Sequence, residues 1–185
     1  MKKILLIVSL TLSASVLAGA QQWSVGTNLL GLANMGTLNM EASASVARHF
    51  TVNASMQANP WTFHAGDTDR QRQNRSQSYE AGIRWWPWYV YSGWWAGASA
   101  RWQEYNRGGW RSRETEEGDA FGLDLRAGYT LMLRDNLNIE FGAGLWGGRK
   151  VYTVYECPHC GRITEDGKRW FVLPSDVMLS LVFIF

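Results

Sequence analysis

The chain has 185 residues, a formal net charge of +2 at pH 7, eleven Trp and two Cys. Without Lys2 and Lys3, sixteen basic residues balance sixteen acidic ones, which argues against a nucleic-acid partner because a phosphate-binding surface needs clustered positive charge. Two cysteines are too few for a disulfide-scaffolded fold.

The first twenty residues have the pattern of a secretory signal peptide. Lys2 and Lys3 give a positive start, residues 4–17 are mostly apolar, and residues 18–20 form a small-residue cleavage site. The apolar run is shorter than a membrane-spanning helix with flanks requires. We therefore predict a signal peptide at residues 1–20 and one exported domain at residues 21–185, in a Gram-negative cell.

The exported part is dominated by alternation of apolar and polar residues, the pattern of a strand with two different faces. A run of ten residues is also the length of one tilted bilayer crossing by a strand. Eight strands are predicted, in chain order, at residues 23–32, 38–47, 50–59, 79–85, 94–103, 121–131, 137–145 and 177–185.

The predicted connections alternate in length. After the first connection, at residues 33–36, short turns at residues 48–49, 87–93 and 134–136 alternate with long polar loops at residues 61–77, 106–119 and 150–171. Short turns at one end and long loops at the other are typical of an up-and-down barrel. The predicted fold is all-β, an eight-stranded antiparallel up-and-down transmembrane β-barrel in the outer membrane, where lipid is its first partner.

The residue types on the two faces of these strands favour a barrel whose outer surface contacts lipid over one whose outer surface contacts water. Alternation alone also fits a soluble barrel, but residues 21–149 contain no lysine, which a soluble surface normally spreads widely. The polar register holds small residues and opposed charges, which we expect to pair inside the ring because an unpaired buried ion is costly. The eight charges of this predicted network are Glu41, Glu80, Arg84, Arg101, Asp124, Arg126, Glu140 and Asp176.

Cys157 and Cys160 form the clearest local motif, a C-x-x-C. The spacing suits a small disulfide, and export to an oxidising compartment favours that interpretation. The alternatives are half of a metal site, completed by a partner or a second chain, and a redox pair. We expect no resident metal and no cofactor.

His64 is the only histidine whose neighbours suggest catalysis, because Asp67, Asp69 and Ser76 follow it in the first long loop. Some eight-stranded outer-membrane enzymes that act on lipid use a histidine, a serine and an acid near the outer rim. These neighbours also fit a plain solvated loop, and nothing in the spacing orients a base against a nucleophile. We therefore predict no catalytic residue and keep a lipid-modifying enzyme as an alternative.

Several segments carry a family resemblance: GTNLLGLANMGTLNMEAS (26–43), ANPW (58–61), RWWPW (84–88), GLDLRAGY (122–129), ECPHCG (156–161) and LSLVFIF (179–185). With them the chain resembles a family of Bacteroidota outer-membrane barrels catalogued as domain of unknown function 3575. No activity is assigned to that family, and similar proteins are often encoded beside fimbrial genes. With its long loops, the chain is expected to be a non-enzymatic surface protein. Surface interaction or adhesion, or fimbria-associated assembly with a surface protein partner, is therefore the expected role. An accessory subunit of a larger surface complex is a further alternative.

Overall fold

The computed structural model describes residues 23–34, 36–67, 70–110, 112–159, 161–175 and 177–185. The predicted signal peptide, Asp69, Cys160 and Asp176 lie outside them. Within the described residues the elements are, in chain order, β1 (Trp23–Asn28), α2 (Leu29–Ala33), β2 (Leu38–Ala47), β3 (Phe50–Asn59), β4 (Thr62–Phe63), β5 (Arg72–Trp85), β6 (Gly93–Gly108), β7 (Thr115–Arg134), β8 (Leu137–Tyr155), β9 (Ile163–Pro174) and β10 (Met178–Ile184).

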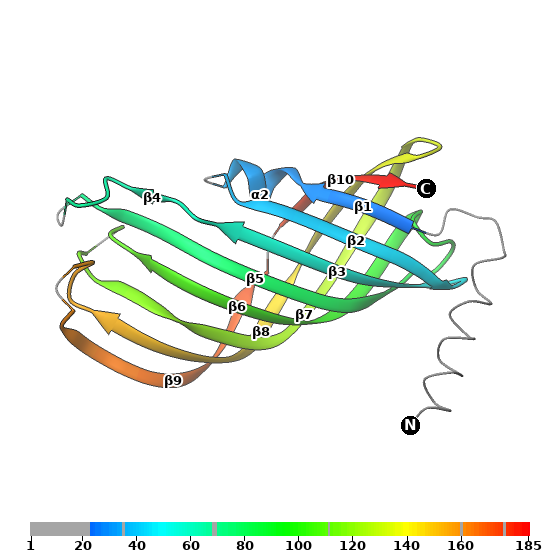
Figure 1. Ribbon diagram of the computed structural model, residues 1–185. Coiled ribbons are helices and arrows are strands. Elements are labelled where there is room, and N and C mark those ends of the chain that lie inside the picture. Colours follow the sequence, from blue (N-terminus) through cyan, green and yellow to red (C-terminus); the bar gives the residue numbers. More distant parts are fainter. Residues whose placement is uncertain (1–22, 35, 68–69, 111, 160, 176) are drawn as a thin grey trace, which may run out of the picture.

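Eight of these strands form a closed antiparallel ring, which is seen from its side in Figure 1. Neighbours in the ring follow chain order from β1 through β2, β3, β5, β6, β7 and β8, and β10 pairs with both β8 and β1. The last and first strands are joined at their ends by paired backbone hydrogen bonds between Trp23 and Phe185, of 3.1 and 3.0 Å. The predicted all-β class and the eight sequential antiparallel strands are confirmed.

The first predicted strand is too long. Residues 38–47 and 50–59 coincide with β2 and β3, but β1 ends at Asn28 and a short helix, α2, replaces residues 29–33 of the prediction. The Asn28 side chain accepts a hydrogen bond from the Leu30 N–H at 3.1 Å and so caps the helix. The run Leu29-Leu30-Gly31-Leu32 also lacks alternation, so nothing ties it to a two-faced strand.

The three predicted long loops are mostly strand, which corrects the loop prediction. Strands β5 to β8 continue past the ring and, with β4 and β9, form what we call the sheet extension: residues 62–63, 72–77, 104–108, 115–119, 149–155 and 163–174. It occupies the left side of Figure 1. Both faces of the extension carry polar residues, so the alternation in hydropathy fades while the backbone pairing continues.

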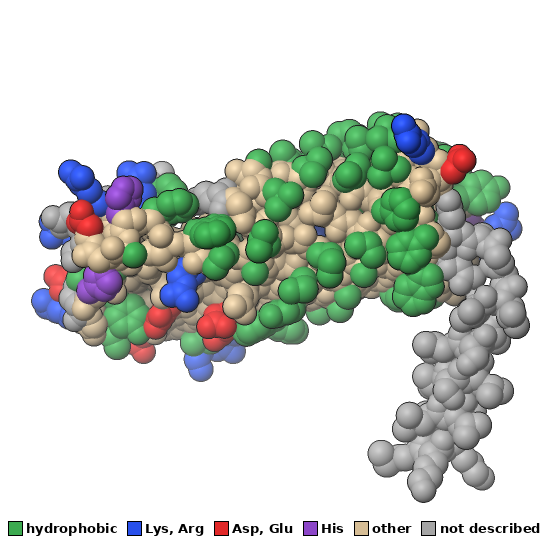
Figure 2. Space-filling model, turned by 45° about the horizontal axis from the view of Figure 1, so that its top comes forward, with side chains coloured by type: hydrophobic (Ala, Val, Ile, Leu, Met, Phe, Trp, Pro, Cys, Tyr) green, Lys and Arg blue, Asp and Glu red, His purple; other side chains and the backbone are tan. Residues whose placement is uncertain are grey.

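The outer face of the ring is apolar. Figure 2 shows green side chains over the ring and charged ones gathered at its two ends. On β7 this face runs from Phe121 to Leu131, ten residue steps or about 33 Å along the strand, which for a tilt of about 40–45° gives a band about 25 Å tall. We call the following exposed residues the apolar belt: Trp23, Val25, Leu38, Met40, Val46, Phe50, Val52, Met56, Tyr79, Ile83, Trp85, Trp94, Trp102, Phe121, Leu123, Leu125, Leu131, Phe141, Leu145, Leu181, Phe183 and Phe185.

The exposed charged side chains of the described residues lie outside the apolar belt. Across the part of the chain that the structure describes, exposed Asp, Glu, Lys and Arg lie in the turns or on the sheet extension. The same part of the chain has no helix of the length and apolarity needed to cross a membrane.

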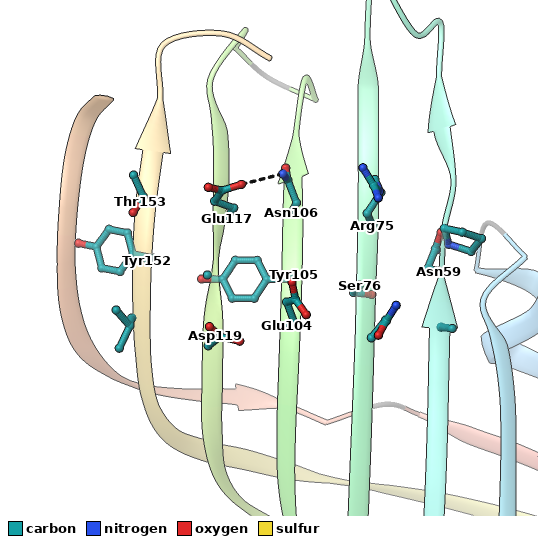
Figure 3. A pocket seen from close by; sticks show the side chains of 15 residues that line it. Asn59, Arg75, Ser76, Glu104, Tyr105, Asn106, Glu117, Asp119, Tyr152 and Thr153 are labelled. Atoms are coloured by element: carbon teal, nitrogen blue, oxygen red, sulfur yellow. Dashed lines mark hydrogen bonds between the residues drawn. The ribbon is translucent and has the colours of Figure 1, made fainter. Parts of the chain in front are cut away.

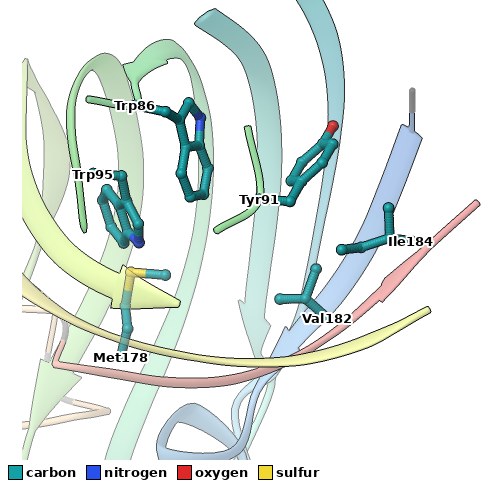
Figure 4. Packing of buried hydrophobic residues seen from close by; sticks show 6 residues of the cluster. All are labelled: Trp86, Tyr91, Trp95, Met178, Val182 and Ile184. Atoms are coloured by element: carbon teal, nitrogen blue, oxygen red, sulfur yellow. The ribbon is translucent and has the colours of Figure 1, made fainter. Parts of the chain in front are cut away.

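A cluster of large side chains fills the ring at its turn end (Figure 4), and we call it the aromatic plug: Trp86, Tyr91, Trp95, Met178, Val182 and Ile184. Trp86 Nε1 donates to Thr51 Oγ1 at 3.1 Å, and Asn138 Nδ2 donates to the Tyr91 carbonyl at 2.7 Å. A Cβ at Gly128 would lie 2.5 Å from the Trp95 ring, so a glycine is needed where this indole crosses β7.

Candidate functional site

Inside the ring, Arg84 holds two carboxylates in what we call the Arg84 layer. Its guanidinium lies 2.7 Å from Glu41 and 3.2 Å from Glu140. The Thr130 hydroxyl also donates to Glu140 at 3.2 Å, and the Trp95 ring lies 4.4 Å from the guanidinium carbon. Because the charges are matched by neighbours, the layer locks β2, β5, β7 and β8 together rather than offering a free acid or base.

A second set, the Arg126 layer, lies nearer the extension on β5 and β7 and includes residues of β6. Arg126 contacts Glu80 and lies 3.0 Å from Asp124, and Asp124 also lies 3.5 Å from Arg101. Ser99 Oγ donates to Glu80 at 2.5 Å. Seven of the eight charges predicted for the interior therefore lie inside the ring in two connected groups, and the eighth, Asp176, lies outside the described residues.

Next to the Arg126 layer, towards the extension, is a hollow of about 410 Å³ that we call the inner cavity. Trp146 and Phe171 pack edge to face at 4.7 Å on its apolar side, and Arg101 stacks on the same indole at 4.5 Å. The whole lining is Gln103, Tyr105, Arg107, Gly108, Gly109, Trp110, Ser112, Glu114, Glu116, Ala120, Trp146, Lys150, Phe171 and Leu173. An apolar wall beside a few charged groups is typical of a small-molecule site.

Glu116 is the best-connected charge of the inner cavity. Its carboxylate contacts the Lys150 ammonium and accepts a hydrogen bond from Tyr105 OH at 2.6 Å. Burial alone would raise the pKa of Glu116, but the hydrogen bonds from Lys150 and Tyr105 outweigh it and hold that pKa below its ordinary value of 4.5. Burial and the neighbouring carboxylate raise the pKa of Tyr105, so the phenol stays protonated as a donor.

We expect acid to loosen the extension through Glu116. Because the pKa of Glu116 is lowered on folding, its contribution to the free energy of unfolding is present above pH 4.5 and is lost as the pH falls through the folded value. The loss is about 1 kcal/mol or less, since the group is partly exposed. Urea unfolding midpoints at pH 6 and pH 3 measure it, and Glu116→Gln should show a smaller pH dependence. If the urea midpoint changes equally between pH 6 and pH 3 in wild type and in Glu116→Gln, Glu116 is not the source of the acid sensitivity.

The extension has a second, larger hollow of about 600 Å³, which we call the outer cavity (Figure 3) and which shares Tyr105 with the inner cavity. It spans the strands from β3 to β8, and alternation places Glu104, Asp119 and Glu117 on the face that becomes the apolar belt farther down each strand. Asn106 Nδ2 donates to Glu117 at 3.1 Å, drawn as a dashed line in Figure 3, and Tyr155 OH donates to the same carboxylate at 2.7 Å. Carboxylates therefore predominate on a concave surface just beyond the belt.

The cysteine motif lies at the tip of the extension, in the connection between β8 and β9. Cys157 is buried, and His159 Nε2 lies 2.8 Å from Gln71 Oε1, which joins this tip to the segment before β5. Cys160 lies outside the described residues, so the disulfide stays a prediction. The described His, Cys, Asp and Glu residues form no group of three that could hold a metal ion.

The residues considered for catalysis, His64, Asp67 and Ser76, do not form one cluster. His64 is exposed just past β4, where Phe63 pairs with Arg72, whereas Ser76 lies four residues farther along β5, about 13 Å away along the strand. Asp67 is exposed in the turn after His64, where its N–H donates to the His64 carbonyl at 3.2 Å. The described residues therefore do not place this base beside this nucleophile.

A model of a protein family described as "Protein of unknown function (DUF3575)" matches residues 4–185. The chain belongs to this DUF3575 family. No curated protein matches the chain. The family part of the resemblance drawn from the sequence is confirmed.

Sequence reasoning missed the inner-cavity residues of this DUF3575 chain. Tyr105 lies between the predicted strand at residues 94–103 and the predicted loop at residues 106–119, Glu116 lies inside that loop, and Phe171 ends the predicted loop at residues 150–171. One signal could have found them: the alternation of the interior register continues from Arg101 through Gln103 to Tyr105. Lys150 was visible as one of only two lysines after residue 20.

Proposed function

We propose that this DUF3575 chain is an outer-membrane protein whose ring crosses the bilayer as an eight-stranded barrel. Residues 1–20 would direct export, the amino terminus and short turns face the periplasm, and the sheet extension faces outward. Its role is non-enzymatic contact with another surface molecule, by adhesion or by fimbria-associated assembly.

The inside-out distribution of side chains carries this proposal. The apolar belt faces outward, with Leu123 and Phe121 more than 60% exposed, while Arg84 and Arg126 are no more than 9% exposed within the ring. In water, such a band would leave a large apolar surface solvated, which soluble monomers rarely do. In lipid, the closed ring satisfies the backbone groups of its strands, and the aromatic residues at the belt edges suit the headgroup regions.

The extension supports binding rather than catalysis. Its two cavities are lined largely by residues of paired strands, so most of each lining is positioned by the sheet instead of by loose loops. Neither lining places a histidine or cysteine beside a hydroxyl group. Rigid concave surfaces with charged rims suit recognition of a surface partner.

Heat-dependent gel mobility tests the barrel. The mature chain, refolded in detergent or lipid, should migrate differently before and after boiling, because a closed ring resists the denaturing detergent until it is heated. A chain that stays monodisperse in plain buffer and shows unchanged mobility would falsify the proposal.

Thiol labelling of intact cells tests the orientation. In a chain whose two native cysteines are replaced by serine, Asp67→Cys in the extension should react with a membrane-impermeant reagent. The matched variant Asn136→Cys, in an exposed short turn, should react only after the outer membrane is opened. The reverse pattern would place the extension in the periplasm.

A further inference from the structure

Strand β9 forms a free edge of the sheet extension. It pairs with β8 over Ile163–Pro174, and it ends the strand order, so no strand of the described chain pairs with its other side. Figure 1 shows β9 as the lowest strand, with no strand beyond it. A long unpaired edge presents a row of backbone donors and acceptors that can take up another strand.

The sequence of β9 is complementary to itself when two copies run antiparallel. Residues 163–171 read ITEDGKRWF, with acidic Glu165-Asp166 and basic Lys168-Arg169 on either side of Gly167. If Gly167 lies opposite its own copy, Asp166 faces Lys168 and Glu165 faces Arg169, each pair occurring twice. Opposed charges directly across an antiparallel pair stabilise it.

The outer positions of the same alignment also match. Ile163 then faces Phe171, an apolar pair, and Thr164 faces Trp170. The four charged residues and Trp170 are exposed, and Trp170 is 79% exposed. The three atoms nearest to a Cβ built on Gly167 belong to the Tyr152 side chain, at 3.5–3.7 Å, so a side chain at the midpoint of the strand would make ordinary contacts.

Other pairings of this edge fit less well. Parallel pairing in register would set Glu165 against Glu165 and Lys168 against Lys168, and like charges directly opposite are destabilising. The edge at the opposite side of the extension is β4, which has only two residues, Thr62 and Phe63, and offers a shorter ladder. A second β9, related by a two-fold axis through Gly167, pairs residues 163–171, most of the strand, and makes each contact twice.

We propose that β9 is a self-adhesion strand that pairs antiparallel with β9 of a second copy in a facing membrane. Antiparallel pairing reverses every strand direction in the sheet, and β8 runs unbroken from ring to extension, so the two rings point in opposite directions. Two copies inserted the same way in one membrane cannot adopt that arrangement. This inference rests on the proposed outer-membrane function and names the partner: the same chain on another surface.

A charge swap tests the partner. The positive variant is Glu165→Lys/Asp166→Lys and the negative variant is Lys168→Glu/Arg169→Glu. The control is Asp67→Lys/Glu156→Lys, which makes the same charge change as the positive variant at exposed residues that line neither cavity. Light scattering should show that vesicles carrying wild type or control cluster. Vesicles carrying either variant alone should lose most of this clustering, and a mixture of the two variants should recover at least half. Clustering of each variant alone, or a mixture that stays dispersed, overturns the proposal.

A cross-link tests the register in detergent, independently of the membrane. In a chain with both native cysteines replaced by serine, Gly167→Cys should give an oxidised dimer, because only the residue on the axis meets its own copy at disulfide distance. Glu165→Cys should stay monomeric, since its own copy lies about 14 Å away along the strands. Equal dimer yields, or none from Gly167→Cys, overturn the proposal. Heat-dependent mobility of the same samples shows separately whether the barrel has failed.

Discussion

Replacing Leu125 with Arg is expected to stop the ring from inserting into a bilayer. Leu125 lies on the outward face of β7, is 58% exposed, and pairs with Ala98 and Leu145 on the two neighbouring strands. It is near the middle of the apolar belt, where a guanidinium meets hydrocarbon and costs about 2–4 kcal/mol. A penalty of that size is a large part of the stability of a small protein.

The measurement is the amount of protein whose gel mobility changes on boiling, both in outer-membrane fractions and after refolding into lipid. Leu125→Ala controls for the loss of the leucine and should insert nearly as well as wild type. Val151→Arg introduces the same charge on the sheet extension, where Val151 is 47% exposed, and should insert normally. If Leu125→Arg inserts as well as Val151→Arg, the belt does not face lipid and the outer-membrane assignment fails.

Replacing Arg126 with Met is expected to cost about 3–5 kcal/mol, because it leaves buried carboxylates without their cation. Arg126 contacts both Glu80 and Asp124, and Asp124 is fully buried. Arg101 remains beside Asp124 at 3.5 Å, so the loss falls mainly on Glu80. The ring should therefore unfold at lower urea concentration and at a lower temperature in the mobility assay.

A second change distinguishes a charge effect from lost packing. Adding Glu80→Gln to Arg126→Met removes the stranded carboxylate and should restore part of the stability, whereas a packing defect would not recover. Arg162→Met is the matched surface change, since the Arg162–Glu156 pair at 3.4 Å is largely exposed, and it should have little effect. Equal losses from Arg126→Met and Arg162→Met would show that the Arg126 layer is not a stabilising network.

The alternation in sequence predicted the ring because each ring strand separates two unlike environments. Residues 38–47 and 50–59 coincide with β2 and β3, and the charges from Glu41 to Glu140 share the interior for the same reason. Along residues 164–169 of β9 and the outer part of β8, polar residues lie on both faces. The contrast between the faces therefore disappears there, and the sequence predicts a loop instead of a strand.

The site features depend on contacts between distant segments. The inner cavity needs Tyr105 beside Trp146 and Phe171, which come from three strands and are far apart in the chain. The aromatic plug was partly hidden for another reason: Val182 and Ile184 are apolar residues in the inward register, so the hydropathy of the last strand does not tell its two faces apart. Asn28, by contrast, carried a local signal for the helix cap.

The aromatic plug and the two charge layers fill the ring one after the other along its length. Trp86 and Asp124 are fully shielded from solvent, and two hollows beside Arg126 have volumes of about 30 and 10 Å³, room for a water molecule but not for a larger solute. If the ring spans a bilayer as we propose, this filling would leave no path for ions through it. A cell could then display the protein at high density without making its envelope permeable to salts, nutrients or antibiotics, which suits the proposed role in surface contact.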